Sequence, residues 1–144
     1  MKVCEVMSTD VQCTRPDATL HQAADKMKSL DVGSLPVCHQ DKLVGMITDR
    51  DIVVRSVAEG HDPETDHVGD VMSSELYYCY EDQDVKETAH MMKEKQVRRI
   101  PVLNRNKRLV GIVSLGDLAV APCSDDLVEE TLEGISEPAG HGVH

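Results

Sequence analysis

The sequence has 144 residues, of which 40% are hydrophobic and 28% charged, and its formal net charge at pH 7 is −11. A chain of this length can bury a core without a disulfide or metal staple. The acidic charge argues against nucleic acid and anionic membranes as partners, because both attract a basic surface. With no Trp, no Phe and only three Tyr, the chain also lacks an aromatic platform for stacking single-stranded nucleic acid.

The cysteines and the amino terminus bear on the cellular compartment. Five widely spaced Cys form no C-x-x-C pair, which is typical of a reduced protein rather than of a disulfide framework. Residues 1–10 have no long apolar run of the kind found in secretory signals, and no stretch approaches the roughly 18 apolar residues of a membrane helix. We therefore expect a cytoplasmic protein that does not associate with membranes.

The elements of the first half are predicted by periodicity and turn residues. Apolar residues recur at helical spacing over Leu20–Leu30. Two short β-prone runs follow, separated by a polar turn, and a second helix begins at Thr48. In chain order, we expect a lead-in strand near Val11–Thr14, a helix over Leu20–Leu30, strands at Leu35–Cys38 and Leu43–Ile47, and a helix from Thr48.

The second half repeats the first. A shift of 65 residues superimposes Val6 on Val71, and one extra residue near Asn106 raises the shift to 66. The matches keep one order across both halves, and the clearest are Val6-Met7-Ser8 with Val71-Met72-Ser73, Pro36-Val37 with Pro101-Val102, Gly45 with Gly111, and Asp51 with Asp117. The corresponding elements are a lead-in strand near Leu76–Tyr80, a helix from Val85, strands at Ile100–Leu103 and Leu109–Val113, and a helix from Ser114. The chain is therefore predicted to hold two copies of one small unit.

Three motifs that occur twice at this spacing resemble a pair of CBS domains, an arrangement called a Bateman module. They are the Val-Met-Ser lead, the x-x-Pro-Val strand and the Gly-x-x-Ser/Thr-x-x-Asp turn, and the resemblance covers about residues 1–122. The segments Thr48–Ile52, Val97–Val102 and Leu109–Val113 are most similar to small stand-alone bacterial CBS-pair proteins, among them the hypoxic-response type. No single motif is specific, but the ordered and duplicated set is.

The expected fold is of the α/β (α+β) class. It has two CBS repeats, each a short mixed sheet with two helices, packed about a pseudo-two-fold axis, since neither repeat could cover its sheet alone. The expected boundaries are a first repeat at 1–60, a linker at 61–70, a second repeat at 71–122 and an acidic tail at 123–144. The tail is expected to be either a short amphipathic helix or a solvated segment.

Two interpretations apply to Thr48 with Asp51 and to Ser114 with Asp117. Each pair has the spacing of a helix capping box, in which the hydroxyl accepts a bond from a free backbone N–H and the carboxylate bonds back. The resemblance implies a second role, because in CBS pairs this Asp binds ribose hydroxyls and the Ser or Thr lies near the ribose or phosphate. Either role accounts for the residues.

Three arginines are candidate phosphate ligands. The resemblance places Arg98 and Arg99 where nucleotide-binding CBS pairs contact phosphates, whereas Gly33 and Ser34 fill these places in the first copy. Arg50 sits in the first helical turn, where a cation opposes the helix dipole by up to about 1 kcal/mol, so a third phosphate contact is an interpretation of its presence.

The adenine of a bound nucleotide is expected to lie between strand backbones. The small apolar side chains expected to line that slot are Val11, Val32, Leu35 and Ile47.

Metal binding and catalysis have weaker signals. Cys38 and His39 are neighbours on a strand and would point to opposite faces, so Cys38 is interpreted as a small buried side chain. A zinc site assembled across a dimer stays an alternative, with His141 and His144 near the carboxyl end. The sequence has no Gly-rich P-loop, no H-E-x-x-H motif and no interpretable Ser/His/Asp set, so we expect no enzymatic activity.

Two classes of function follow. The first is a non-catalytic regulatory module that senses AMP, ADP, ATP or S-adenosylmethionine between its repeats, requires no cofactor, and signals in trans to an unidentified protein through conformation or dimer packing. The resemblance also implies a homodimer and a stress role. The alternative is a structural, dimeric interaction module with no nucleotide ligand, and a Cys/His metal-binding stress protein is a weaker one.

Overall fold

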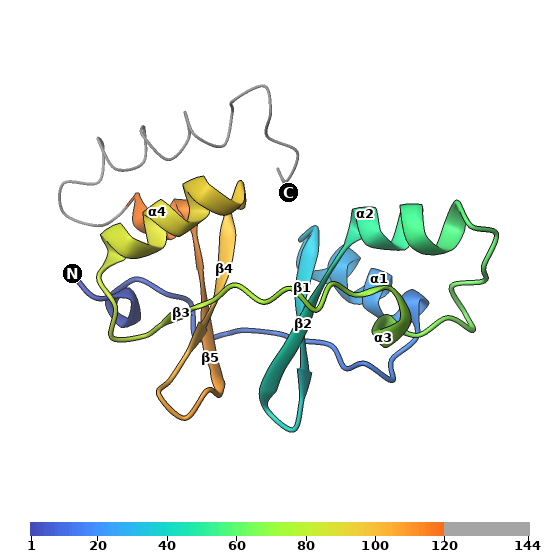
Figure 1. The fold of residues 1–144 in the computed structure, drawn as a ribbon, viewed down its shortest axis with the longest axis horizontal. Coiled ribbons are helices and arrows are strands. Elements are labelled where there is room, and N and C mark those ends of the chain that lie inside the picture. The colour runs from blue at the N-terminus through green and yellow to red at the C-terminus, as the bar shows by residue number, and fades with distance from the viewer. Residues whose placement is uncertain (120–144) are drawn as a thin grey trace. The chain divides into compact units, whose positions relative to one another are not determined.

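The computed structural model describes residues 1–119, so the expected tail at 123–144 and the last residues of the second repeat lie outside the described residues. The described chain divides into two units. We call Gln12–Leu76 the central unit, and Met1–Val11 together with the chain from Tyr77 onward the terminal unit. Each unit is a small sheet covered by helices, as expected for the α/β class (Figure 1).

The central unit contains a β-hairpin and the helices around it. In chain order it comprises α1 (Leu20–Leu30), β1 (Ser34–His39), β2 (Lys42–Thr48), α2 (Asp49–Ile52), a π-helical turn η2 (Val53–Val57) and α3 (Val68–Val71). Helix α1 begins at a complete capping box between Thr19 and Gln22 and ends where Asp31 takes a left-handed conformation, with φ of 55°. The two-residue turn Gln40-Asp41 has φ of 52° and 66°, which matches the twist of the antiparallel β1–β2 pair.

The terminal unit repeats this plan with one more strand. It comprises η1 (Val3–Glu5), β3 (Cys79–Tyr80), α4 (Val85–Lys95), β4 (Arg99–Leu103), β5 (Leu109–Ser114) and α5 (Leu115–Leu118). Strand β4 pairs with β3 in parallel and with β5 antiparallel. Its register shifts between Val102 and Leu103, and β1 has the matching irregularity between Val37 and Cys38. The two copies therefore share local geometry as well as sequence.

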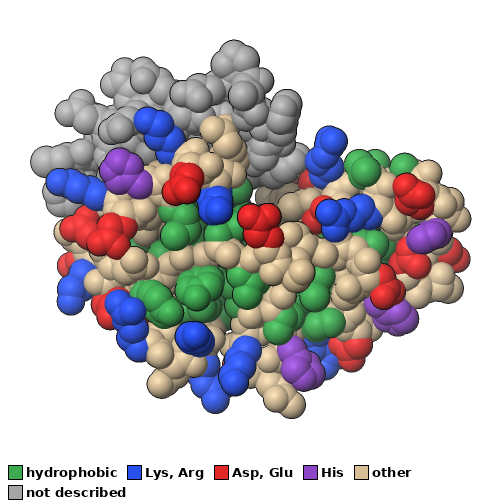
Figure 2. All heavy atoms as spheres, viewed as in Figure 1, with side chains coloured by type: hydrophobic (Ala, Val, Ile, Leu, Met, Phe, Trp, Pro, Cys, Tyr) green, Lys and Arg blue, Asp and Glu red, His purple; other side chains and the backbone are tan. Residues whose placement is uncertain are grey.

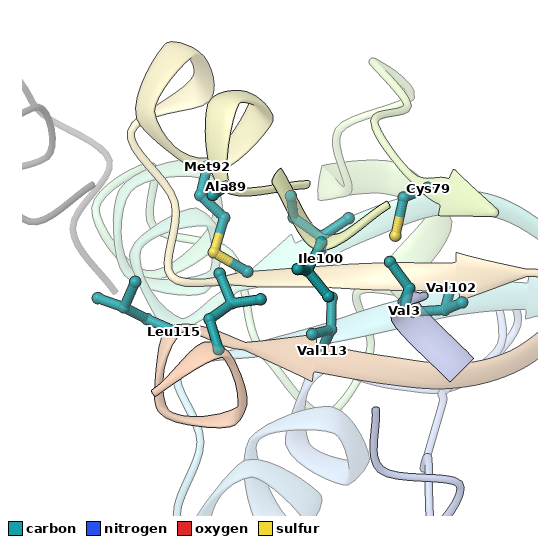
Figure 3. Close-up of a cluster of buried hydrophobic side chains, with 10 residues drawn as sticks. Val3, Cys79, Ala89, Met92, Ile100, Val102, Val113 and Leu115 are labelled. Atoms are coloured by element: carbon teal, nitrogen blue, oxygen red, sulfur yellow. The ribbon is translucent and has the colours of Figure 1, made fainter. Parts of the chain in front are cut away.

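Each unit buries its own hydrophobic cluster. In the terminal unit the side chains come from η1, β3, α4, β4, β5 and α5, and Figure 3 shows Met92 and Ala89 above the strands beside Ile100 and Val113. The core of the central unit consists of Leu20, Ala23, Met27, Leu35, Val37, Ile47, Ile52, Val68 and Val71. Residues from three helices and two strands thus meet at one face of the β1–β2 hairpin.

The boundaries of the two folding units differ from those of the two sequence repeats. Val6-Met7-Ser8 belongs to the terminal unit, where the Ser8 N–H donates to the Ile112 carbonyl and the Ile112 N–H donates back, each at 2.9 Å. Val71-Met72-Ser73 belongs to the central unit, where Ser73 makes the same pair of bonds with Met46 at 2.8 and 2.9 Å. Each lead therefore packs on the strand of the other sequence copy.

The two motif glycines make these contacts possible. A Cβ on Gly111 would lie 2.7 Å from the Ser8 carbonyl oxygen and 2.7 Å from Met7 Sδ. A Cβ on Gly45 would lie 2.7 Å from the Ser73 carbonyl oxygen and 2.8 Å from Met72 Sδ. The close approach of the lead to the strand requires a residue without a side chain.

The expected helices and hairpin strands are present, with differences at the edges. The lead-in strand of the first copy is reduced to one parallel bridge between Thr14 and Val37. The linker expected at 61–70 overlaps the start of α3, where Val68 is fully buried in the core of the central unit. Within residues 1–119, none of the helices is long and apolar enough to cross a membrane.

Candidate functional site

The candidate site of the central unit is the junction at which β2 turns into α2. Thr48 has the extended conformation of a helix N-cap, and its Oγ1 accepts a bond from the Asp51 N–H at 3.0 Å. The Asp51 Oδ2 accepts from the Thr48 N–H at 3.0 Å, which completes the capping box. The Asp51 side chain is 18% exposed, and its Oδ1 lies 3.9 Å from Arg55 Nε one turn along the helix.

The equivalent junction of the terminal unit, between β5 and α5, has the same geometry. The Ser114 Oγ accepts from the Asp117 N–H at 3.1 Å, and the Asp117 Oδ2 accepts from the Ser114 N–H at 2.7 Å. Within residues 1–119, the Asp117 Oδ1 forms no ion pair comparable with the one between Asp51 and Arg55. Both carboxylates therefore act as caps and commit one oxygen to that task, which confirms the capping interpretation for all four residues.

The predicted phosphate ligands of the second copy lie beside this junction. Arg99 is the cross-strand partner of Ser114, and the Arg98 carbonyl accepts a bond from the Leu115 N–H at 2.9 Å. Arg98 is exposed and Arg99 is partly buried. Arg98 and Arg99 thus lie next to the helix that carries Asp117, although within residues 1–119 neither guanidinium forms an ion pair with that carboxylate.

In the central unit the same positions carry no charge. Ser34 pairs with Thr48 across the strands, and the Gly33 carbonyl accepts from the Asp49 N–H at 2.9 Å. A Cβ on Gly33 would lie 3.2 Å from an Asp49 carboxylate oxygen, so an acidic group covers the place where the other copy presents Arg98. Arg50 is exposed on α2 of this unit. Its convergence with Arg98 and Arg99 on one ligand stays a prediction.

The apolar residues expected to line an adenine slot have packing roles within the units. Leu35 is 2% exposed and Ile47 is fully buried, both in the core of the central unit, and Val32 packs against that core. Val11 is partly buried where the two units meet along the chain. Burial in the core accounts for Leu35 and Ile47, and contact of any of the four with an adenine stays a prediction.

Sequence reasoning missed two features near these sites. Arg55 is the partner of Asp51, and the i, i+4 spacing of the two residues could have indicated it. Cys13 shares a side-chain hydrogen bond with Cys38, which lowers the pKa of the Cys13 thiol to about 6. Cys38 was expected to be a small buried side chain, and its burial is confirmed at 5% exposure. The pairing of the lead-in segment with β1 was the available signal for this contact.

The expected separation of Cys38 from His39 is also confirmed, since Cys38 is buried and His39 is exposed. Residues 1–119 contain no group of three or more His, Cys, Asp or Glu side chains arranged to hold a metal ion. Cys123, His141 and His144 lie outside the described residues.

Comparison with known proteins identifies the repeats. The family profile described as CBS domain matches residues 3–57 and 68–123. The CBS domain-containing protein YhcV of Bacillus subtilis is 40% identical over 139 residues, which cover 96% of this chain and 98% of YhcV. Hypoxic response protein 1 of Mycobacterium tuberculosis is 41% identical over 116 residues, or 80% of each chain.

Solved structures agree with this match. Hypoxic Response Protein I with two coordinated zinc ions has a TM-score of 0.77 at 40% identity, covering 85% of this chain and 100% of that one. The CBS domain pair of protein MJ0100, in complex with 5′-methylthioadenosine and S-adenosyl-L-methionine, has a TM-score of 0.71 at 24% identity, covering 83% and 93%. The second likeness shows the fold alone.

The structure of Hypoxic Response Protein I contains zinc, so the question is whether the residues of this chain could also hold it. Structural zinc takes four ligands in tetrahedral geometry, mainly thiolate and imidazole. The described part of this chain offers two adjacent thiols, Cys13 and Cys38, and no third ligand beside them. Within residues 1–119, these two thiols therefore do not form a complete zinc site.

Proposed function

The chain belongs to the CBS-domain family, and from that membership we propose that it is a non-catalytic regulatory protein. It binds an adenine nucleotide or a related adenosyl compound and signals in trans to a separate protein. The MJ0100 pair supports this ligand class, because a CBS pair of the same fold holds two adenosyl compounds.

The observation that carries the proposal is the state of Asp117. A carboxylate can accept about four hydrogen bonds, and the cap uses one of them, at Oδ2. The remaining capacity suits the two hydroxyls of a ribose, which donate to a carboxylate in a bidentate manner. Capping and ribose binding are therefore compatible roles, and the cap fixes the carboxylate before the ligand arrives, which lowers the entropy cost of binding.

The charges beside the two junctions favour the terminal unit for a phosphate-bearing ligand. There, Arg98 and Arg99 accompany the single carboxylate of Asp117. In the central unit, two carboxylates, Asp49 and Asp51, accompany Arg50 and Arg55. A phosphate therefore gains more from the terminal junction, since guanidinium groups bind phosphate oxygens in a bidentate geometry. The nucleotide is therefore expected to bind at the junction of the terminal unit more tightly than at that of the central unit.

The test is thermal unfolding of the full chain with AMP, ADP, ATP and S-adenosylmethionine. A ligand at 100 times its dissociation constant adds about 2.7 kcal/mol to the stability, which raises Tm by roughly 8 °C for a chain of this size. The key variant is Asp117→Asn, which retains a carbonyl oxygen for the cap and replaces the second carboxylate oxygen with an NH2 group that cannot accept from a ribose hydroxyl. Asp51→Asn is its matched control.

The proposal expects Asp117→Asn to keep most of its ligand-free Tm and to lose the ligand-induced shift, while Asp51→Asn keeps that shift for a phosphate-bearing ligand. Arg98→Gln with Arg99→Gln should lower the affinity for ATP more than for adenosine. If no adenosyl compound at millimolar concentration raises the Tm of the native chain, the nucleotide hypothesis is wrong.

One observation favours the alternative function, a dimeric interaction module. Val53, Val54 and Val57 are 57%, 44% and 54% exposed on α2 and η2, and the apolar spheres over this end of the central unit are visible in Figure 2. Three exposed valines on one helical segment suit a contact with a second copy. Val54→Asp should shift the mass measured by light scattering from dimer to monomer. A native chain that is a monomer at all concentrations tested would exclude this function.

A further inference from the structure

The two cysteines of the central unit are brought together by backbone pairing. The Thr14 N–H donates to the Pro36 carbonyl and the Cys38 N–H donates to the Thr14 carbonyl, each at 2.9 Å. These bonds fasten the lead-in segment parallel to β1. They bring Cys13 alongside the strand, where its sulfur shares a hydrogen bond with the Cys38 thiol.

The two thiols have opposite environments. Cys13 is partly exposed, whereas Cys38 is 5% exposed. The bond from Cys38 lowers the pKa of Cys13 from its ordinary 9.0 to about 6, assisted by Lys26, while partial burial and Asp41 oppose this shift. The same bond, together with burial, raises the pKa of Cys38. At neutral pH the pair is therefore an accessible thiolate beside a protonated, buried thiol.

This combination has a defined chemistry. A thiolate attacks peroxides, whereas a thiol does not, and a neighbouring thiol then resolves the product. Lys26 supports the thiolate from a fixed position, because its Nζ donates to the Cys13 carbonyl at 2.8 Å. The other described cysteines lack these features. Cys79 is buried, which raises the pKa of its thiol. Cys4 is exposed, and within residues 1–119 its thiol shares no hydrogen bond with another thiol.

We propose that Cys13 and Cys38 form a peroxide-responsive thiol pair that closes to an intramolecular disulfide. The Cys13 thiolate attacks one oxygen of a hydroperoxide and the O–O bond breaks, giving a sulfenic acid and hydroxide from hydrogen peroxide. The Cys38 sulfur then attacks the Cys13 sulfur, the S–O bond breaks, and water leaves with the proton of the Cys38 thiol. The pair loses two electrons and the peroxide gains them.

The consequence concerns the segment between the two residues. A disulfide would covalently join the lead-in segment to β1 and close a loop that contains the whole of α1. In the reduced state, the hydrogen bonds around the Thr14–Val37 bridge hold the two segments together without a covalent link. The terminal unit has no counterpart, because Tyr78 and Leu103 occupy the positions equivalent to Cys13 and Cys38. Oxidation therefore acts on one unit alone.

The experiment uses the reduced full chain in a buffer with a metal chelator. Pulse alkylation with iodoacetamide, followed by peptide mapping, gives the rate at Cys13 as a function of pH. That rate should be half of its plateau near pH 6, where an ordinary thiol of pKa about 8.5 has below about 1% of its plateau. Free N-acetylcysteine serves as the reference.

Oxidation is then followed by intact mass under non-reducing conditions. A small excess of hydrogen peroxide should lower the mass by about 2 Da, the two hydrogens lost on disulfide formation, and the cross-linked peptides should contain Cys13 and Cys38. Cys38→Ser should abolish the mass loss and leave a Cys13 sulfenic acid that dimedone traps, whereas Cys4→Ser should change neither result.

Two results would overturn the inference. One is a Cys13 alkylation profile that follows the N-acetylcysteine reference, which needs no variant and so does not depend on folding of Cys38→Ser. The other is a peroxide-treated native chain in which Cys13 is oxidised or unmodified without a bond to Cys38. Both readouts are independent of nucleotide binding.

Discussion

Substitution of Gly111 by Ala tests the contact between the Val-Met-Ser lead and β5. The added Cβ would lie 2.7 Å from the Ser8 carbonyl oxygen, a backbone atom that cannot rotate away. Ser8 and Ile112 are joined by two hydrogen bonds of 2.9 Å, so the lead can retreat only if both bonds lengthen. Ordinary van der Waals contact begins at 3.4 Å, so the Ser8 carbonyl would have to move away by about 0.7 Å.

These contacts determine how much stability Gly111→Ala loses. Overpacking by one methyl group costs about 1–3 kcal/mol, and each weakened backbone hydrogen bond adds up to about 1 kcal/mol. The reduced flexibility of the unfolded chain returns about 0.4–1 kcal/mol. The net loss of stability is about 2–3 kcal/mol, which lowers Tm by roughly 6–10 °C.

Gly116→Ala is the matched control, because its nearest heavy atom, Ser114 Oγ, would lie 3.6 Å from the new Cβ. That residue lies in α5, where Ala is the better helix former, so its Tm should stay the same or rise. Circular dichroism melts of both variants provide the comparison. Equal Tm values for Gly111→Ala and Gly116→Ala would refute the argument that the motif glycine exists to admit the lead.

The remaining predictions concern caps and charge. Ser114→Ala removes the acceptor for the Asp117 N–H and should lower the free energy of unfolding by about 1 kcal/mol, measured by urea denaturation. Ser29→Ala, on the exposed side of α1, should leave it unchanged. Equal effects of the two substitutions would show that the cap does not stabilise the protein. The bidentate bond to Arg105 holds the pKa of Asp82 below its ordinary value of 3.8. A lowered folded-state pKa adds stability above pH 3.8 that is lost as the pH falls through the folded value, so the Tm difference between the native chain and Arg105→Gln should shrink on acidification. An NMR titration in which the Asp82 midpoint is the same in both proteins would contradict this.

The sequence predicted most of the secondary structure, for identifiable physical reasons. The α1 helix follows from a strong 3.6-residue periodicity bounded by the Thr19 cap, and both hairpins follow from short β-prone runs around polar turns. The duplication supported the predicted helices and hairpin strands of the second copy, whereas η1 and α3 were not predicted. The capping boxes were read from spacing alone, since the donor and acceptor lie three residues apart on one chain.

Features that depend on contacts across sequence distance were not predictable in this way. Val68 lies in a segment rich in charge and turn residues, which indicates a linker, yet packing of the β1–β2 hairpin buries it completely. The Cys13–Cys38 contact joins residues from two segments that meet only at the Thr14 bridge. The sequence pattern also did not show that Leu35 and Ile47 share a buried cluster with side chains of α1, whereas their contact with an adenine stays a prediction. The local sequence pattern predicts the secondary-structure element, whereas the role of each side chain depends on the residues that pack against it.

The exchange of leads explains why the repeat and the folding unit cannot coincide. The core of the central unit includes Val68 and Val71, with Met72 packed against it, and all three follow the end of the first repeat at about residue 60. Burial of Val68 and of Val71 contributes about 1.5–3 kcal/mol each, a large share of the 5–15 kcal/mol that stabilises an ordinary domain. The first repeat alone, residues 1–60, would lack that stabilisation and would carry a Val-Met-Ser lead with no strand to pack on. The two copies thus fold as interdependent halves, because each lead packs on a unit built around the other copy's helix junction.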